Sequence, residues 1–187
     1  AKKMAEQLNI KNCNFICCDV LNLPIKDISF DKVYSFSFLQ HFSEENLQII
    51  LNQIHKIIKP KGVFKTLMVN KYSLRGLYNE YKIKNSRIEM LQKGRIEERI
   101  DDNNFNVRYF SIKKINNMFK LNFNLKNFQS YCFFTQAQKE DLSILIFKSK
   151  IYIIISLFLT SLFKFIPFSK YISDNLIYTL EKNEEKL

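Results

Sequence analysis

The chain alternates short apolar runs with longer amphipathic segments. Residues 1–9 carry apolar side chains at helical spacing and predict a helix. Residues 14–19 form an apolar run too brief for a helix, and it ends at Asp19, so it predicts a buried strand. Residues 32–37 are rich in aromatic and β-branched side chains and predict a second strand.

A helix is expected to follow, with Ser43 as its N-cap and two glutamates in its first turn. Pro60 ends it, and residues 63–69 predict a third strand. Strands that alternate with a crossover helix are typical of an α/β layer. The predicted helix has one apolar stripe at spacings of three and four, made of Leu47, Ile50, Leu51, Ile54 and Ile58.

The second half of the chain is less regular. Residues 71–110 are polar and predict an insertion or lid, with some helix near residues 74–81. Ser111 is expected to cap another helix, which ends near residue 122. Strands are predicted over residues 125–134 and 176–180.

A strongly apolar stretch lies at residues 151–166, in which Ile151 to Phe163 carry no charge. A membrane-spanning helix needs about 20 apolar residues, so this stretch is short for that purpose. We expect a helix buried on the sheet or beneath the insertion. The alternative is a helix that lies in a membrane interface, with flanking lysines near the lipid headgroups.

Composition narrows the functional classes. The length of 187 residues fits one domain, and the net charge of +11 comes from lysines scattered along the chain rather than from a basic motif, so nucleic acid is not the expected partner. The four cysteines form no C-x-x-C pair, which argues against zinc and for reduced cytosolic thiols. The sequence contains no P-loop, H-E-x-x-H or G-x-S-x-G motif.

Residues 19–33 follow a recognisable order: an acid that ends a strand, a Leu-Pro pair, and then Ser-Phe-Asp before the next strand. This order resembles the Rossmann-like (class I) S-adenosylmethionine-dependent methyltransferases that act on small molecules, a group that includes the ubiquinone and menaquinone biosynthesis enzymes. Lys61 stands where these proteins usually have glycine, which is expected to alter a turn but not the fold. The likeness continues at residues 39–41, 58–62, 109–111 and 178–182.

The resemblance implies an α/β fold with a mostly parallel sheet and an antiparallel last strand. Residues 1–70 would form part of the cofactor-binding core, residues 71–110 the insertion or lid, and residues 111–187 the remainder, including an apolar helix at 142–166. The sequence has only three glycines and no G-x-G loop, which in this family holds the methionine part of the cofactor. We therefore expect an N-terminally truncated chain that lacks the first two strands of the sheet.

S-adenosylmethionine is the cofactor that the resemblance implies, and residues at two strand ends would contact it. For each of these positions, a solvated strand end or plain core packing is the alternative. His41 would serve as a general base, or else as a structural histidine of the loop. The residues implied for adenine are Asp19, Val20 and Leu21, and those for the methionine part are Ser35, Phe36 and Ser37.

The expected activity is methyl transfer to a small-molecule or lipid-like acceptor by a cytoplasmic protein, with this fragment itself inactive. One alternative is a non-catalytic methyltransferase-like remnant. Another is a peripheral membrane protein that is anchored through residues 151–168. An apolar acceptor pocket would be lined by Phe128, Tyr131, Phe133, Phe134 and the segment 151–168.

Overall fold

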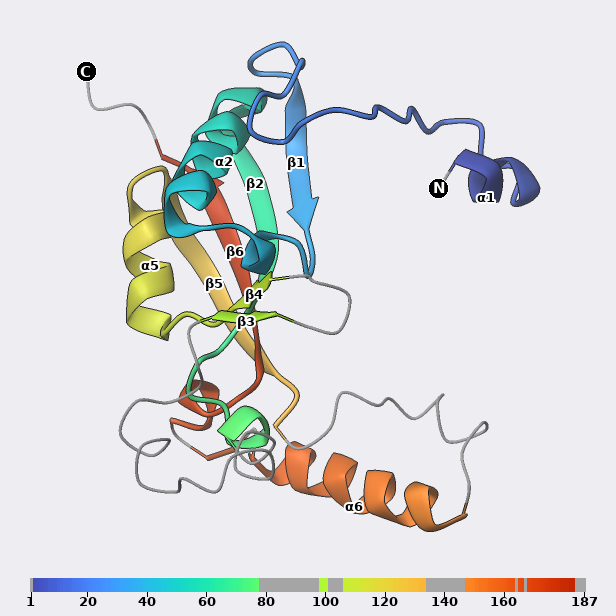
Figure 1. The fold of residues 1–187 in the computed structure, drawn as a ribbon, viewed down its shortest axis with the longest axis vertical. Helices are drawn as coiled ribbons and strands as arrows, with labels where there is room; N and C mark the ends of the chain where they lie inside the picture. The colour runs from blue at the N-terminus through green and yellow to red at the C-terminus, as the bar shows by residue number, and fades with distance from the viewer. Residues whose placement is uncertain are drawn as a thin grey trace.

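A four-stranded sheet in the order β1-β2-β6-β5 forms the centre of the computed structural model (Figure 1). The structure describes residues 2–77, 98–100, 106–133, 147–163, 165–166 and 168–183. The sheet strands are β1 (Phe30–Ser35), β2 (Ile58–Val69), β5 (Phe123–Tyr131) and β6 (Asn175–Lys182).

The sheet is mixed. β1 and β2 are parallel, and α2 (Glu44–Ile57) is the crossover between them. β6 lies between β2 and β5 and is antiparallel to both, so β1, β2 and β5 share one direction. The predicted sheet, mostly parallel with an antiparallel last strand, is confirmed. Each loop that joins two of these strands therefore lies beyond the carboxyl ends of β1, β2 and β5, which we call the carboxyl edge of the sheet, or beyond their amino ends.

Two capped helices cover one face of the sheet. In α2, the Ser43 hydroxyl accepts a hydrogen bond from the Asn46 backbone N–H at 3.2 Å. In α5 (Ile112–Lys120), the Ser111 hydroxyl accepts one from the Lys114 backbone N–H at 3.3 Å. Both N-caps are where the sequence predicts them. Each satisfies one backbone donor of a first helical turn.

Aromatic side chains pack α5 against the sheet. Phe64 of β2 lies 6.4 Å from Phe119 of α5 and 5.4 Å from Phe123 of β5, measured between ring centroids. Tyr178 of β6 lies 5.1 Å from Phe119. Burial raises the pKa of Tyr178 above its ordinary value, because water no longer stabilises a phenolate. This cluster joins three strands to one helix.

The strand predicted at residues 14–19 is wrong. After α1 (Lys2–Gln7), residues 10–19 run as extended, exposed chain, with Phe15 and Ile16 exposed by 47% and 62%. A strand needs a neighbour for its backbone groups, and no described strand pairs with this segment. Its apolar side chains therefore have nothing to pack on.

Two strand boundaries also differ from the prediction. β1 begins and ends two residues before the predicted strand 32–37, because Ser37 has a left-handed φ of 52° that ends the extended backbone. β2 begins at Ile58 and so contains Pro60. The register between β1 and β2 is irregular there, and β6 pairs with β2 only from Val63 onward, so a residue without an N–H is tolerated at Pro60.

Most of the predicted insertion at 71–110 lies outside the described residues. Residues 74–77 are helical, and β3 (Glu98–Ile100) pairs with β4 (Asn106–Arg108) as a separate antiparallel pair. Short 3-10 turns occur at η1 (Leu39–His41) and η3 (Ser169–Tyr171).

The predicted apolar helix is present as α6 (Phe147–Phe163), while residues 142–146 of its predicted range lie outside the described part. Among the described residues, no helix is long and apolar enough to cross a membrane. The expectation that this helix is buried is wrong, because much of its apolar surface is exposed. A helix is buried only as far as other elements cover it, and Figure 1 shows α6 extending away from the sheet.

The turn between α2 and the regular part of β2 is strained at one residue. Lys61 adopts a left-handed φ of 62°, a conformation that costs a non-glycine residue about 1–2 kcal/mol. The next residue, Gly62, needs glycine for a different reason. A Cβ there would lie 2.6 Å from Ile58 Cγ2 and 2.8 Å from the Lys59 carbonyl oxygen.

We expect Lys61→Gly to raise the free energy of unfolding by about 1 kcal/mol, because glycine adopts positive φ without a Cβ penalty. Gly62→Ala is the matched neighbour, and it should lower the free energy of unfolding through its steric clash. Urea denaturation of both variants measures the two effects. Destabilisation by Lys61→Gly would show that the lysine side chain contributes more than its backbone strain costs.

Candidate active site at the carboxyl edge of the sheet

Open α/β sheets bind ligands beyond the carboxyl ends of their parallel strands. In this chain that edge carries the loop after β1, the loop after β2 and, because β6 is antiparallel, the segment that enters β6. In Figure 1 these segments lie at the lower end of the sheet, where the β1 arrow points. The candidate site is built from these three segments.

The first segment holds three of the residues predicted to contact the cofactor. Ser35 ends β1, and its hydroxyl is buried without a hydrogen-bond partner among the described residues. Phe36 is exposed, with its ring 6.3 Å from that of Tyr34. Ser37 turns the chain with its left-handed backbone. The loop after β1 thus contains the Ser35 hydroxyl, which has no hydrogen-bond partner in the described residues, and the exposed ring of Phe36.

The turn η1 continues this loop and is held from the side by β4. The Arg108 guanidinium donates a hydrogen bond to the His41 carbonyl oxygen at 3.0 Å. The side-chain oxygen of Gln40 is buried without a partner in the described part of the chain. Ser35 and Gln40 therefore each carry a buried side-chain oxygen without a hydrogen-bond partner among the described residues, and such a group in a folded protein calls for an explanation.

The remaining predicted cofactor residues, Asp19 to Leu21, lie elsewhere. The Asp19 carboxylate accepts a hydrogen bond from the Leu21 backbone N–H at 2.9 Å, and Gln53 donates to the Leu21 carbonyl at 3.4 Å. Gln53 lies about one turn before the end of α2, whose last residue adjoins the start of β1. Val20 and Leu21 pack on the core there. The structure therefore does not bring Asp19 together with Ser35.

Asn70 organises the loop after β2. Its side-chain amide donates to the carbonyl oxygens of Tyr171 at 2.7 Å and Ser173 at 2.9 Å. Its side-chain oxygen accepts from the Tyr72 backbone N–H at 3.1 Å. Asn70 also bridges to Phe110 in a short parallel contact. One buried amide thus joins the second and third segments of the site.

A buried ion pair supports the same edge. Asp174 is fully buried and accepts hydrogen bonds from the Ser73 hydroxyl at 2.7 Å and from the Arg75 guanidinium. Its backbone N–H donates to the Cys132 carbonyl at 2.8 Å. The Ser73 hydroxyl also accepts from the Gly76 N–H at 3.0 Å. These bonds tie the loops after β2 and β5 to the start of β6.

An open cavity of about 610 Å³ adjoins this network. This volume is within the range of small-molecule sites. No group of three or more metal-ligating side chains occurs in the described ranges. The cavity lining mixes aromatic, amide and hydroxyl groups: Asn70, Tyr72, Ser111, Ile112, Lys113, Asn116, Asn117, Tyr171 and Ile172.

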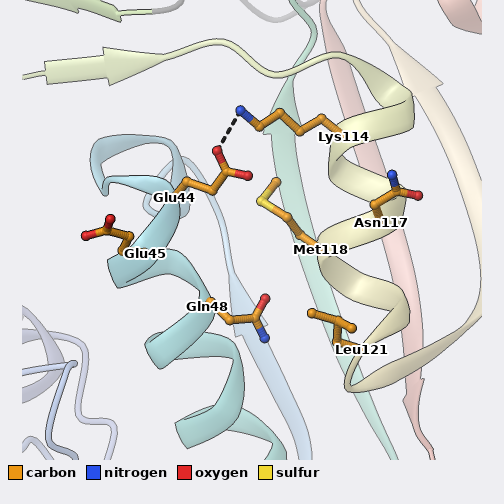
Figure 2. Close-up of a pocket in the computed structure, with 7 residues that line it drawn as sticks. All are labelled: Glu44, Glu45, Gln48, Lys114, Asn117, Met118 and Leu121. Carbon is orange, nitrogen blue, oxygen red and sulfur yellow. Dashed lines mark ion pairs between the residues drawn. The ribbon is translucent and has the colours of Figure 1, made fainter.

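A second hollow of about 600 Å³ lies between α2 and α5 and shares Asn117 with the cavity beside Asn70. Figure 2 shows Glu44 reaching across it to Lys114, an ion pair of 2.6 Å between partly exposed side chains, with Glu45 pointing away from α5. Met118 and Leu121 supply its apolar side. This groove separates two packed helices and contains none of the predicted site residues.

Sequence reasoning missed Asn70 and Asp174. Asn70 comes directly after a predicted strand, a position at which polar residues of α/β proteins are ligand or loop-organising candidates. Asp174 is the first acid after a long acid-free stretch, and it comes two residues before a predicted strand. Both signals are present in the sequence, but neither reveals that the two residues meet.

Comparisons with known proteins agree with this architecture. Residues 1–65 match a family described as a methyltransferase domain. The uncharacterized protein MJ0638 of Methanocaldococcus jannaschii is 40% identical over 70 residues, which cover 36% of this chain and 30% of that protein.

Solved structures resemble nearly the whole chain. The PH0226 protein of Pyrococcus horikoshii superposes with a TM-score of 0.57 at 15% identity, over 97% of this chain and 65% of that one. The 1,6-didemethyltoxoflavin-N1-methyltransferase of Burkholderia thailandensis, solved with S-adenosylhomocysteine, gives a TM-score of 0.55 at 13% identity, over 98% and 56%. This chain thus spans less than two thirds of each of these proteins. It shares the Rossmann-like α/β fold of these solved structures.

Removing the positive partner of Asp174 should be costly. We expect Arg75→Met to lower the free energy of unfolding by about 3–5 kcal/mol, because the buried carboxylate loses the guanidinium that balances its charge. Lys59→Met is the control: Lys59 pairs with Asp31 at 3.0 Å, but both side chains are well exposed, so no measurable change is expected. Equal urea midpoints for the two variants would contradict this account of Asp174.

The thiol of Cys132 should be protected. Burial, and then the negative charge of Asp174, raise the pKa of Cys132 from about 9 to about 11. The contribution of the neutral Cys132 thiol to the free energy of unfolding is therefore fully present below pH 9 and is lost as the pH rises from about 9 to about 11. The difference in unfolding free energy between the parent and Cys132→Ala should shrink over that interval.

In the folded protein, alkylation at neutral pH should modify the exposed Cys13, Cys17 and Cys18 but spare Cys132.

Proposed function

We propose that this chain forms part of an S-adenosylmethionine-dependent methyltransferase that acts on a small-molecule or lipid-like acceptor, with its active site at the carboxyl edge of the sheet. The observation that carries the proposal is the strand order β1-β2-β6-β5, with β6 inserted antiparallel, together with the methyltransferase-domain match over residues 1–65. Solved structures with this fold include methyltransferases, one of them with S-adenosylhomocysteine bound.

The methionine end of the cofactor would lie beside the loop after β1. Ser35 Oγ and Gln40 Oε1 are buried and have no hydrogen-bond partner in the described part of the chain, and they fit this role because polar groups of a ligand would satisfy them. The main chain around Phe36 and Ser37 would complete the contact. When bound, S-adenosylmethionine supplies an electrophilic methyl group on a sulfonium. The residues of this loop would align it and exclude water.

The adenine end would be held by Asp19, Val20 and Leu21. This role requires residues 14–19 to pair as a strand, so that Asp19 moves from the side of α2 to the carboxyl edge. The exposed Phe15 and Ile16 support such a change, since pairing would bury them. The G-x-G loop is absent from the 187 residues, and we propose that it lies before residue 1 in a longer chain.

The acceptor would occupy the cavity beside Asn70. Its lining offers aromatic faces with amide and hydroxyl groups, which suits a small, partly apolar molecule. His41 is the candidate general base, because it lies in the turn that follows β1 and an imidazole can accept a proton from the acceptor. Because a general base moves a proton and does not hold the cofactor, His41→Ala should lower the rate of methyl transfer more than it weakens cofactor binding.

Calorimetric titration with S-adenosylhomocysteine tests the proposal on two proteins: the 187-residue chain, and that chain extended upstream by its natural sequence. We expect tight binding by the extended chain and weak or undetectable binding by the shorter one. In the extended chain, Ser35→Ala should weaken binding about fivefold, the value of one hydrogen bond. Thr66→Val is the matched control, since Thr66 is the register partner of Ser35 and also has a buried hydroxyl without a partner in the described residues, but lies within β2.

An extended chain that binds no S-adenosylhomocysteine would overturn the proposal. It would favour the alternative of a methyltransferase-like protein that keeps the fold without the activity. Equal, tight binding by both chains would instead overturn the placement of the missing loop. Equal losses from Ser35→Ala and Thr66→Val would remove Ser35 from the site.

A further inference from the structure

α6 has two different faces. At about 100° per residue, the buried Ile153 and Ser156 lie on one half of the helix. The opposite half is exposed and apolar. Its large exposed side chains are Ile151, Tyr152, Ile154, Ile155, Phe158, Leu159 and Leu162.

Such a face is unusual for a helix at a protein surface. A helix that packs one side on a protein ordinarily presents charged or polar residues on the other. Here the exposed half carries no charged residue between Ile151 and Phe163. A continuous apolar patch of this kind marks a surface that contacts something else.

The segment after α6 adds a second exposed apolar group, the aromatic tip, made of Phe165, Ile166, Phe168 and Tyr171. Phe168 is 75% exposed and has a left-handed φ of 72°, a costly conformation for an aromatic residue. The ring of Tyr171 lies 6.3 Å from that of Phe168 and 5.4 Å from the Lys170 ammonium. The backbone thus accepts strain where an aromatic side chain is directed into solvent.

The charges around these two groups have a single sign. Residues 142–173 contain no aspartate or glutamate. Their lysines lie in the first turn of α6, directly after the helix and within the tip, at Lys148, Lys150, Lys164 and Lys170. Lysines beside an apolar face place their ammonium groups at lipid headgroups, and aromatic residues favour the same interfacial depth.

We propose that α6 and the aromatic tip form a docking surface for an anionic lipid membrane, in which α6 lies in the plane of the interface. The exposed apolar half would enter the boundary of the acyl chains, while the lysines would contact anionic headgroups. A second copy of the chain is a poorer occupant, because two such surfaces would oppose lysine to lysine without a single acid on either side.

This surface lies at a functionally relevant end of the molecule. In Figure 1, α6 extends from the end of the sheet at which β1 finishes. The tip is joined to the candidate site directly, because Tyr171 lines the cavity and accepts a hydrogen bond from Asn70. Docking would therefore hold the carboxyl edge near the lipid surface. The proposal itself does not depend on methyl transfer.

Vesicle flotation of the 187-residue chain tests the docking surface. We expect the protein to float with vesicles of phosphatidylcholine and phosphatidylserine, but weakly with phosphatidylcholine alone and weakly at high salt. The paired change Ile155→Gln with Phe158→Gln should abolish flotation. Both side chains are exposed, so the fold should be unaffected. Leu121→Gln, an equally exposed leucine at the end of α5, is the matched control and should float like the parent.

The lysines provide a second, graded readout. Lys150→Gln and Lys170→Gln should each weaken binding to the anionic vesicles about fivefold. Failure of the parent to float would overturn the proposal, and so would flotation that is unchanged in the Ile155 and Phe158 variant. Light scattering that shows a dimer dependent on Phe158, without flotation, would assign the surface to a second copy instead. Cofactor titration is unaffected by any of these outcomes, so the two proposals fail separately.

Discussion

Backbone groups that leave water need hydrogen-bond partners, and this requirement decides which apolar segments of the chain become strands. β2 meets it on both sides, with β1 as a parallel neighbour and β6 as an antiparallel one. Residues 14–19 also form an apolar run, but no strand among the described residues pairs with them, and they stay extended and exposed. The same requirement explains Asn70 and Asp174, whose buried polar atoms are bonded to the loops around them.

Local features of the fold could be predicted from the sequence because they depend on local physics. Ser43 and Ser111 cap their helices because a hydroxyl before an apolar stripe satisfies a free backbone donor. The strand at 14–19 could not be settled in this way, since strand formation depends on a distant neighbour. The orientation of α6 had the same limitation: its apolar sequence predicts a helix, but which side is covered depends on what packs against it.

The candidate site likewise contains residues that the sequence could place and residues that it could not. Ser35, Phe36 and Ser37 could be placed at a strand end from the sequence, and they lie at the end of β1. Asn70, Tyr171 and Asp174 could not be grouped, because about one hundred residues separate the first from the other two. Their meeting depends on the insertion of β6 beside β2. Pattern reasoning finds residues at the ends of elements, whereas pairs of distant elements decide which of those residues face one another.

The position of β6 also affects the order in which the molecule is assembled. Because Asn175–Lys182 separates β2 from β5, neither of those strands has its native neighbour on that side until the last residues of β6 have left the ribosome. During translation, Phe64 and the edge of β2 that β6 will cover stay without this partner while more than one hundred further residues are synthesised. Such long-range pairing slows folding and leaves apolar edges open to other chains. Expression at low temperature, or with chaperones in excess, should therefore improve the yield of folded protein more than any change to the surface of the finished sheet.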